Sequence, residues 1–108
     1  MQKTTFWDAH THIHFPGFDE DRGEVLARAK DAGVRMITVG TQTSTSESAI
    51  EFAKSNPGVV WATVGFHPGH LAENWHHDAN EQSESIREDF NIEKLKELAL
   101  QKEVVAIG

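Results

Sequence analysis

The chain has 108 residues, which suffice for one ordinary domain and are too few for two. Ten lysines and arginines against 17 acidic residues leave a net charge of -7, so a mainly electrostatic grip on nucleic acid or an anionic membrane is not expected. The chain contains no cysteine, so any metal or catalytic site must use histidine and carboxylate groups. No apolar run is long enough for a signal peptide or a membrane span, and we expect a cytoplasmic location.

Successive segments of the chain share one layout: a short β-rich apolar run, a polar turn, and then helical periodicity. The first run spans residues 4–7 and ends at Asp8. After a turn around residues 15–17, a helix is predicted to begin near Asp19 and to end at Gly33, since acids suit helix starts and glycine suits helix ends. Its predicted apolar face consists of Val25, Leu26, Ala29 and Ala32.

A second strand is predicted over residues 35–40, and the hydroxyl-rich turn 41–46 follows it. Within this turn, Ser44 and Glu47 have the spacing of a capping box, which predicts a helix start. The apolar face of that helix is predicted from Ala49, Ile50, Phe52 and Ala53, and the helix stops at Asn56-Pro57-Gly58. Residues 59–65 are apolar almost throughout, which is typical of a strand buried on both faces.

The last part of the chain predicts one more helix and a fourth strand over residues 104–108. The helix places Ile92, Leu95, Leu98 and Ala99 on one side. The interval before the fourth strand is about 20 residues longer than a usual βαβ repeat. We interpret residues 69–90 as an acidic insertion, with His70, His76 and His77 in contact with solvent. The whole alternation predicts a parallel α/β fold within a single domain.

Polar residues that are unusual in a buried sheet cluster where the predicted strands end. Asp8, His10, His12 and His14 follow the first strand, Thr41 to Thr43 follow the second, and His67 follows the third. In a parallel α/β fold these exits share one rim, which is where such folds place their active sites. The sequence therefore predicts one site built from several strand exits.

His10 and His12 are the candidate metal ligands. An extended backbone repeats every two residues, so it sends both imidazoles to the same face, where they can converge on one divalent ion. His14 continues this period, but the turn that follows breaks the strand and does not favour it as a ligand.

His67 is the candidate catalytic residue. It lies between Gly65, which permits close backbone approach, and Pro68, which holds the preceding residue extended. A fixed imidazole at a strand exit suits phosphate contact or proton transfer. A purely structural hydrogen bond is the alternative.

Several segments together resemble one known family, the TatD-type metal-dependent deoxyribonucleases of the amidohydrolase superfamily. The likeness runs in order from residue 6 to the end, apart from the insertion. The segments are Asp8-Ala9-His10-Thr11-His12-Ile13, Phe18-Asp19-Glu20-Asp21-Arg22, Ala32-Gly33-Val34, Val39-Gly40-Thr41, Val64-Gly65-Phe66-His67-Pro68 and Val104-Val105-Ala106-Ile107-Gly108.

The resemblance implies the N-terminal part of a TIM-type (β/α) barrel of roughly 250 residues, with one or two divalent metal ions at its mouth. It implies hydrolysis of phosphodiester bonds, commonly from a DNA 3′ end. By position, His10 and His12 match metal ligands, His67 matches a histidine near the substrate phosphate, and Asp8 matches an acid that orients the strand. The chain departs from the family at His14, usually Asp or Asn, and at Trp7, usually aliphatic.

The family pattern continues beyond Gly108 with a glutamate, two further histidines and an aspartate. We therefore expect the 108 residues to be an incomplete hydrolase domain that is inactive alone and that needs the rest of the barrel or self-association. The metal ions would supply the local positive field that lets an acidic protein bind DNA.

Two other functions remain open at this point. A phosphoesterase of the polymerase and histidinol phosphatase type also begins with an Asp-x-His-x-His strand. A non-catalytic half barrel is the other alternative, since four strands cannot close an eight-stranded barrel and leave open edges.

Overall fold

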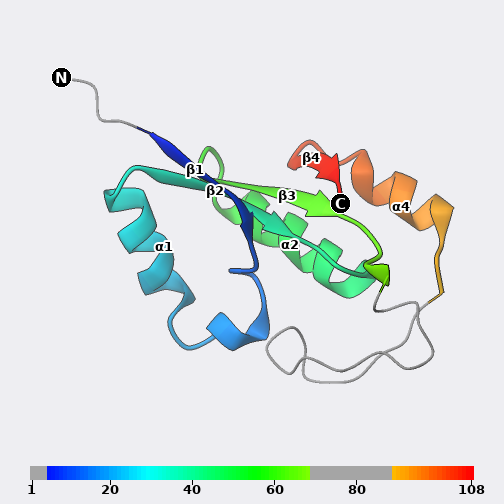
Figure 1. Cartoon of the computed structure of the whole chain (residues 1–108), viewed down its shortest axis with the longest axis horizontal. Helices are drawn as coiled ribbons and strands as arrows, with labels where there is room; N and C mark the ends of the chain where they lie inside the picture. The colour runs from blue at the N-terminus through cyan, green and yellow to red at the C-terminus, as the bar shows by residue number, and fades with distance from the viewer. Residues whose placement is uncertain (1–4, 69–88) are drawn as a thin grey trace.

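The computed structural model describes residues 5–68 and 89–108 (Figure 1). The predicted insertion at 69–90 falls almost entirely outside them, as do His70, His76 and His77. In chain order the elements are β1 (Phe6–Thr11), the 3-10 helix η1 (Pro16–Phe18), α1 (Arg22–Asp31), β2 (Val34–Val39), α2 (Thr43–Ser55), β3 (Val60–Val64), α4 (Ile92–Ala99) and β4 (Val104–Ile107). None of the helices in these two ranges is long and apolar enough to cross a membrane.

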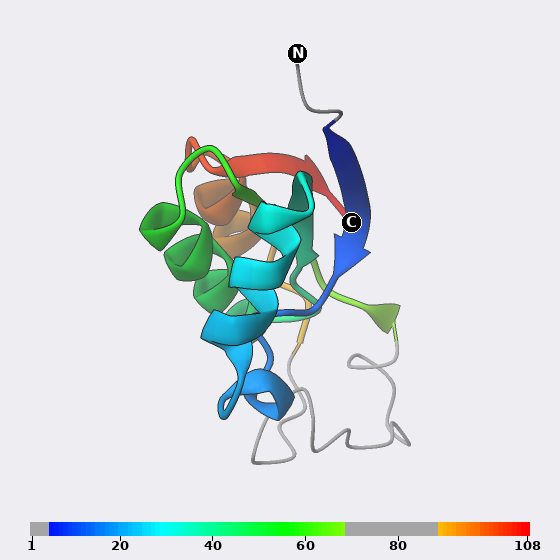
Figure 2. The same ribbon diagram turned by 90° about the vertical axis from the view of Figure 1, so that its left-hand side faces the viewer.

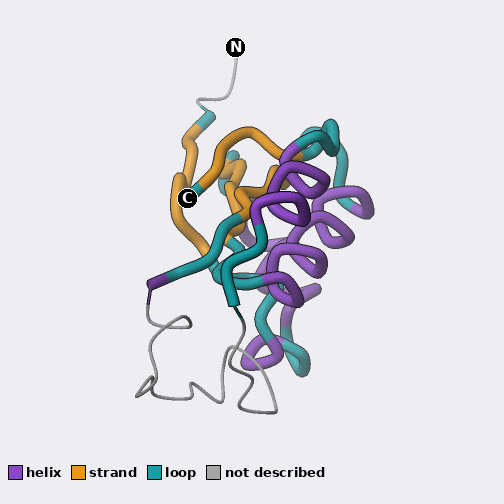
Figure 3. The backbone as a smooth tube through the Cα atoms, turned by 90° about the vertical axis from the view of Figure 1, so that its right-hand side faces the viewer, coloured by secondary structure: helices purple, strands orange, loops and turns teal. Residues whose placement is uncertain are grey.

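The four strands form one parallel sheet in the order β1-β2-β3-β4. Helices α1, α2 and α4 lie on one side of this sheet, as the turned views show (Figures 2 and 3). Each strand therefore pairs with the next one in the chain after a helical crossover. This arrangement confirms the predicted α/β fold and is that of the wall of a (β/α) barrel.

The core lies between the helices and the covered face of the sheet. Alternate residues of β2 and β3 point toward the helices, and the apolar face of α2 packs on them. The main members of this core are Leu26, Met36, Ala49, Ile50, Ala53, Val60, Ala62, Val64, Leu95 and Leu98. The predicted apolar faces of the helices are thus largely confirmed, although Ile92 is 47% exposed and Ala32 lies at the exposed end of α1.

The other face of the sheet has no helix over it in the described part of the chain. Trp7 lies on this face, is 52% exposed, and contacts Trp61 with the ring centroids 5.0 Å apart. The guanidinium carbon of Arg35 lies 5.9 Å from the Trp7 ring. The prediction that the third strand is buried on both faces is largely confirmed, since Thr63 on this face is 8% exposed, but Trp61 is only half-buried.

Two element boundaries also differ from the sequence prediction. The first strand continues past Asp8 to Thr11, because one extra residue is accommodated between these positions as a bulge against β2. The helix expected near Asp19 begins only at Arg22, because the chain first forms η1.

The capping box of α2 differs from the prediction as well. Gln42, rather than Ser44, is the N-cap residue, and Thr45, rather than Glu47, is its partner. Gly33, at a φ of 77°, follows α1, and α2 stops before Asn56, both as predicted.

Candidate functional site

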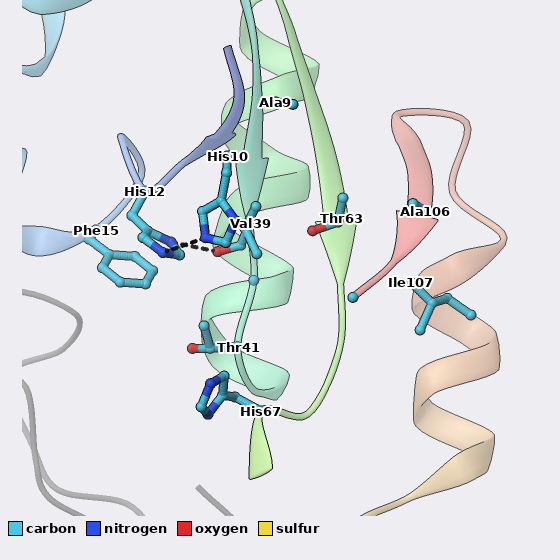
Figure 4. Close-up of a pocket in the computed structure, with 12 residues that line it drawn as sticks. Ala9, His10, His12, Phe15, Val39, Thr41, Thr63, His67, Ala106 and Ile107 are labelled. Atoms are coloured by element: carbon cyan, nitrogen blue, oxygen red, sulfur yellow. Dashed lines mark hydrogen bonds between the residues drawn. The ribbon is translucent and has the colours of Figure 1, made fainter. Parts of the chain in front are cut away.

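A cavity of about 480 Å³ opens at the carboxyl ends of the strands (Figure 4). Its walls include His10 and His12 from the end of β1, and His67 from the segment after β3. The structure therefore brings all three predicted site histidines to one cavity, as the common rim of strand exits predicts. The other residues around it are Ala9, Phe15, Val39, Gly40, Thr41, Thr63, Ala106, Ile107 and Gly108.

The imidazoles of His10 and His12 converge, which confirms that they share a face. Their Nε2 atoms are 3.3 Å apart, and the rings meet edge to face. Nδ1 of His12 lies 3.0 Å from the carbonyl oxygen of Val39 and donates a hydrogen bond to it. In the neutral ring this bond leaves the lone pair on Nε2, the atom that faces His10.

The backbone of β1 explains how the two side chains come to this position. Oδ1 of Asp8 accepts a hydrogen bond of 3.2 Å from the amide of His10, inside the bulge. The hydroxyl of Thr11 donates to the carbonyl of Ile37, which ties the strand to β2 between the two histidines. The contact of Asp8 fits the orienting role that the resemblance implies.

The spacing of the two nitrogens fits a shared metal ion. Two imidazole nitrogens at the usual 2.0–2.1 Å from a tetrahedral zinc ion are about 3.3 Å apart. The Nε2 atoms of His10 and His12 have the same separation in the structure. Within residues 5–68 and 89–108, no group of three or more histidine or carboxylate side chains could hold an ion, so His10 and His12 stand as a pair of candidate ligands in this part of the chain.

Phe15 forms the side wall next to these ligands. Its ring stacks on that of His12 with the centroids 4.3 Å apart and an interplanar angle of 19°. Phe15 is buried, so it limits the positions that the imidazole can adopt. The sequence treats this residue only as part of a turn, and nothing in its pattern marks it as part of the site.

His67 lines the same cavity next to Thr41, apart from the two candidate ligands (Figure 4). Its amide donates a hydrogen bond of 2.7 Å to the carbonyl oxygen of Thr41, while the side chain remains exposed. A Cβ atom at Gly65 would overlap the backbone of Gly108, so this glycine allows the close approach that its position predicts.

His14 does not reach the cavity. It is 7% exposed, lines a separate hollow together with residues of α2, and its Nδ1 is 2.5 Å from Oγ1 of Thr38. Burial, with smaller effects of His12 and Arg22, lowers the pKa of His14 to about 4. The ring is therefore neutral at pH 7 and is a structural residue on the covered side of the sheet.

The fold and the site together define a parallel α/β protein with a candidate metal centre at the carboxyl ends of its strands. The family model described as TatD related DNase matches residues 7–108, and the chain belongs to this family. The resemblance read from the motifs is thus confirmed, in preference to the polymerase and histidinol phosphatase type.

Curated relatives agree with this assignment. The chain is 40% identical over 103 residues to a protein of Pantoea vagans, and 39% and 38% identical to proteins of Cronobacter sakazakii and Erwinia billingiae. Each of the three is named 3′-5′ ssDNA/RNA exonuclease TatD. The matches cover 94% of this chain but only 34–35% of the relatives, so the chain spans about a third of their length.

Proposed function

We propose that this chain supplies the first part of the active site of a metal-dependent exonuclease that acts on single-stranded DNA or RNA from the 3′ end. Family membership and the names of the relatives support the reaction class. The observation that carries the proposal is the 3.3 Å separation of the Nε2 atoms of His10 and His12. The cytoplasm remains our predicted location.

In this proposal His10 and His12 bind a divalent metal ion, with one or two such ions in the complete site. When bound, the metal lowers the pKa of a coordinated water and neutralises charge on the phosphate. The chain as a whole is acidic, so this local positive charge also explains how an anionic substrate is accepted.

The residues around the ligands hold them ready for this task. The carbonyl of Val39 fixes the His12 ring through Nδ1, and Phe15 restricts its face. Partners of this kind keep a ligating imidazole in the correct tautomer and orientation. Asp8 positions His10 indirectly, because its carboxylate accepts a hydrogen bond from the backbone amide of His10.

His67 binds the substrate in this proposal. Its exposed side chain lines the same cavity as the two candidate ligands, so it can meet an oxygen of a phosphate held there. Imidazole can donate a hydrogen bond to that oxygen in either protonation state. Its loss therefore weakens the reaction without removing the metal.

The test measures metal content and cleavage in the natural full-length protein. We expect His12→Ala to lose bound metal and to reduce kcat/KM on a 3′-labelled single-stranded oligonucleotide by at least about 100-fold. His67→Ala should keep the metal and still lose activity. Lys54→Ala, a change of an exposed residue on α2, is the control. Full metal occupancy in both His10→Ala and His12→Ala would contradict the proposed ligands.

The non-catalytic half barrel remains a second candidate for the 108-residue chain alone. The exposed face around Trp7 and Trp61 favours it, because such a face requires a covering partner in water.

A further inference from the structure

The hydroxyl-rich segment 41–46, which follows β2 and includes the first residues of α2, is not used by the proposed reaction. Two of its side chains, Thr45 and Ser46, are nevertheless almost completely buried, with 4% and 0% exposure. Buried hydroxyls are costly unless they form hydrogen bonds, so the partners of these two show what they hold in place.

Thr45 holds the end of β2. Its Oγ1 accepts hydrogen bonds from the backbone amides of Thr41 at 2.8 Å and Gln42 at 3.0 Å. It also lies 3.0 Å from the hydroxyl of Thr41. Thr41 in turn accepts the hydrogen bond from the amide of His67, and Figure 4 shows the two residues next to each other. The hydroxyl of Thr45 thus fixes Thr41, the residue whose carbonyl binds the amide of His67.

Ser46 holds the end of β3. Its Oγ accepts a hydrogen bond of 3.2 Å from the amide of Gly65 and donates one of 3.4 Å to the carbonyl of the same residue. Gly65 lies two residues before His67. The fit is close, because a Cβ atom at Gly40 would be only 2.5 Å from Ser46 Oγ. Ser46 therefore fastens β3 beside the end of β2.

We propose that Thr45 and Ser46 are positioning residues that hold His67 at the cavity. A capping role explains only part of their contacts, since a cap serves the first turn of its own helix whereas Ser46 bonds to the segment after another strand. Together the two hydroxyls bind Thr41, the backbone partner of the His67 amide, and Gly65, two residues before His67. Only the role of His67 in the reaction rests on the proposed function. Its placement by the two hydroxyls does not depend on that function.

The first test measures placement without any activity, by hydrogen exchange of backbone amides followed by NMR in the natural full-length protein. We expect Ser46→Ala and Thr45→Val to increase the exchange rate of the His67 amide by at least about tenfold. Thr45→Ser restores the hydroxyl and should restore the slow rate. Ser55→Ala, at the exposed end of the same helix, is the matched control. An unchanged rate at His67 in both Ser46→Ala and Thr45→Val would overturn the inference.

The second test asks whether the two hydroxyls act through His67. We expect Ser46→Ala to lower kcat/KM by about tenfold in the wild-type background, since a small misplacement of a catalytic group is costly. The same change in a His67→Ala background should have no further effect. Equal losses in both backgrounds would show a general structural role and overturn the inference. If the wild-type protein cleaves no nucleic acid, the proposed function fails, whereas the exchange result still decides the placement of His67.

Discussion

His12 and His14 lie only two residues apart, but the fold gives them opposite surroundings. His12 faces the open cavity with one nitrogen held by a backbone carbonyl and the other presented to His10. His14 is buried on the helix-covered side, against Thr38. The comparison teaches that the covered side uses histidine as a neutral packing group, whereas the open side leaves imidazole available to a ligand.

The largest effect is expected when the 108 residues are studied alone, with the helix-free face of the sheet uncovered. The 108-residue chain purified alone is expected to show no nuclease turnover, because residues 5–68 and 89–108 bring no more than two candidate metal ligands together. Its open sheet face is expected to cause self-association or partial unfolding. Activity assays and light scattering test both expectations, and a well-folded, active monomer of 12.1 kDa would contradict them.

Exchanging the two histidines for asparagine, one at a time, tests the comparison directly. In the natural full-length protein, His12→Asn should lower metal affinity by about 100-fold, whereas His14→Asn should leave it within a few-fold of wild type. Isothermal titration with the metal alone measures both. Equal losses of metal affinity in the two variants would contradict the different surroundings of His12 and His14.

The pH dependence of stability should report His14. An unfolded histidine takes up a proton near pH 6.5, whereas His14 in the fold does so near 4, so the unfolded state binds more protons between these values. Above pH 6.5, His14 therefore does not lower the free energy of unfolding. As the pH is lowered from 6.5 to 4, this free energy falls by at most about 3 kcal/mol. Urea unfolding of the metal-free protein should show a smaller fall for His14→Asn. If the free energy of unfolding falls equally with pH in the wild-type protein and in His14→Asn, His14 is excluded as the source of the pH dependence.

The smallest effect is expected from Phe15, which packs on His12. Phe15→Leu keeps the apolar volume but removes ring stacking worth about 1 kcal/mol, which corresponds to roughly a fivefold change in metal affinity. Phe52→Leu on the covered side is the control, since it should cost stability without changing metal binding. Titration and thermal unfolding separate these two outcomes.

The sequence predicted the parts of the site that depend on strand exits. The periodicity of the apolar residues placed His10, His12 and His67 at one rim, and the structure brings them to one cavity. Whether they bind metal and phosphate remains a prediction. The two-residue period alone does not separate His14 from His12, but the turn after His14 disfavoured it as a ligand, and the structure confirms that His14 lies outside the cavity.

Two features of the structure were not predictable in the same way. The capping box was assigned to Ser44 and Glu47 by local spacing, but Gln42 and Thr45 form it, and glutamine is not among the residues usually preferred at the N-cap. The hydrogen bond from His12 to Val39 depends on the register of two strands, and no residue pattern marks it.

The bulge in β1 has a consequence for how the site is encoded. It adds one residue between Asp8 and Thr11 relative to the facing stretch of β2. If the same residues ran as an even strand without the bulge, His10 rather than Thr11 would lie opposite Thr38, and every later side chain of the strand would turn to the other surface. The number of residues in the strand is thus as informative as their identity, and a redesign that places the same segment on an even strand should turn both histidines toward the core.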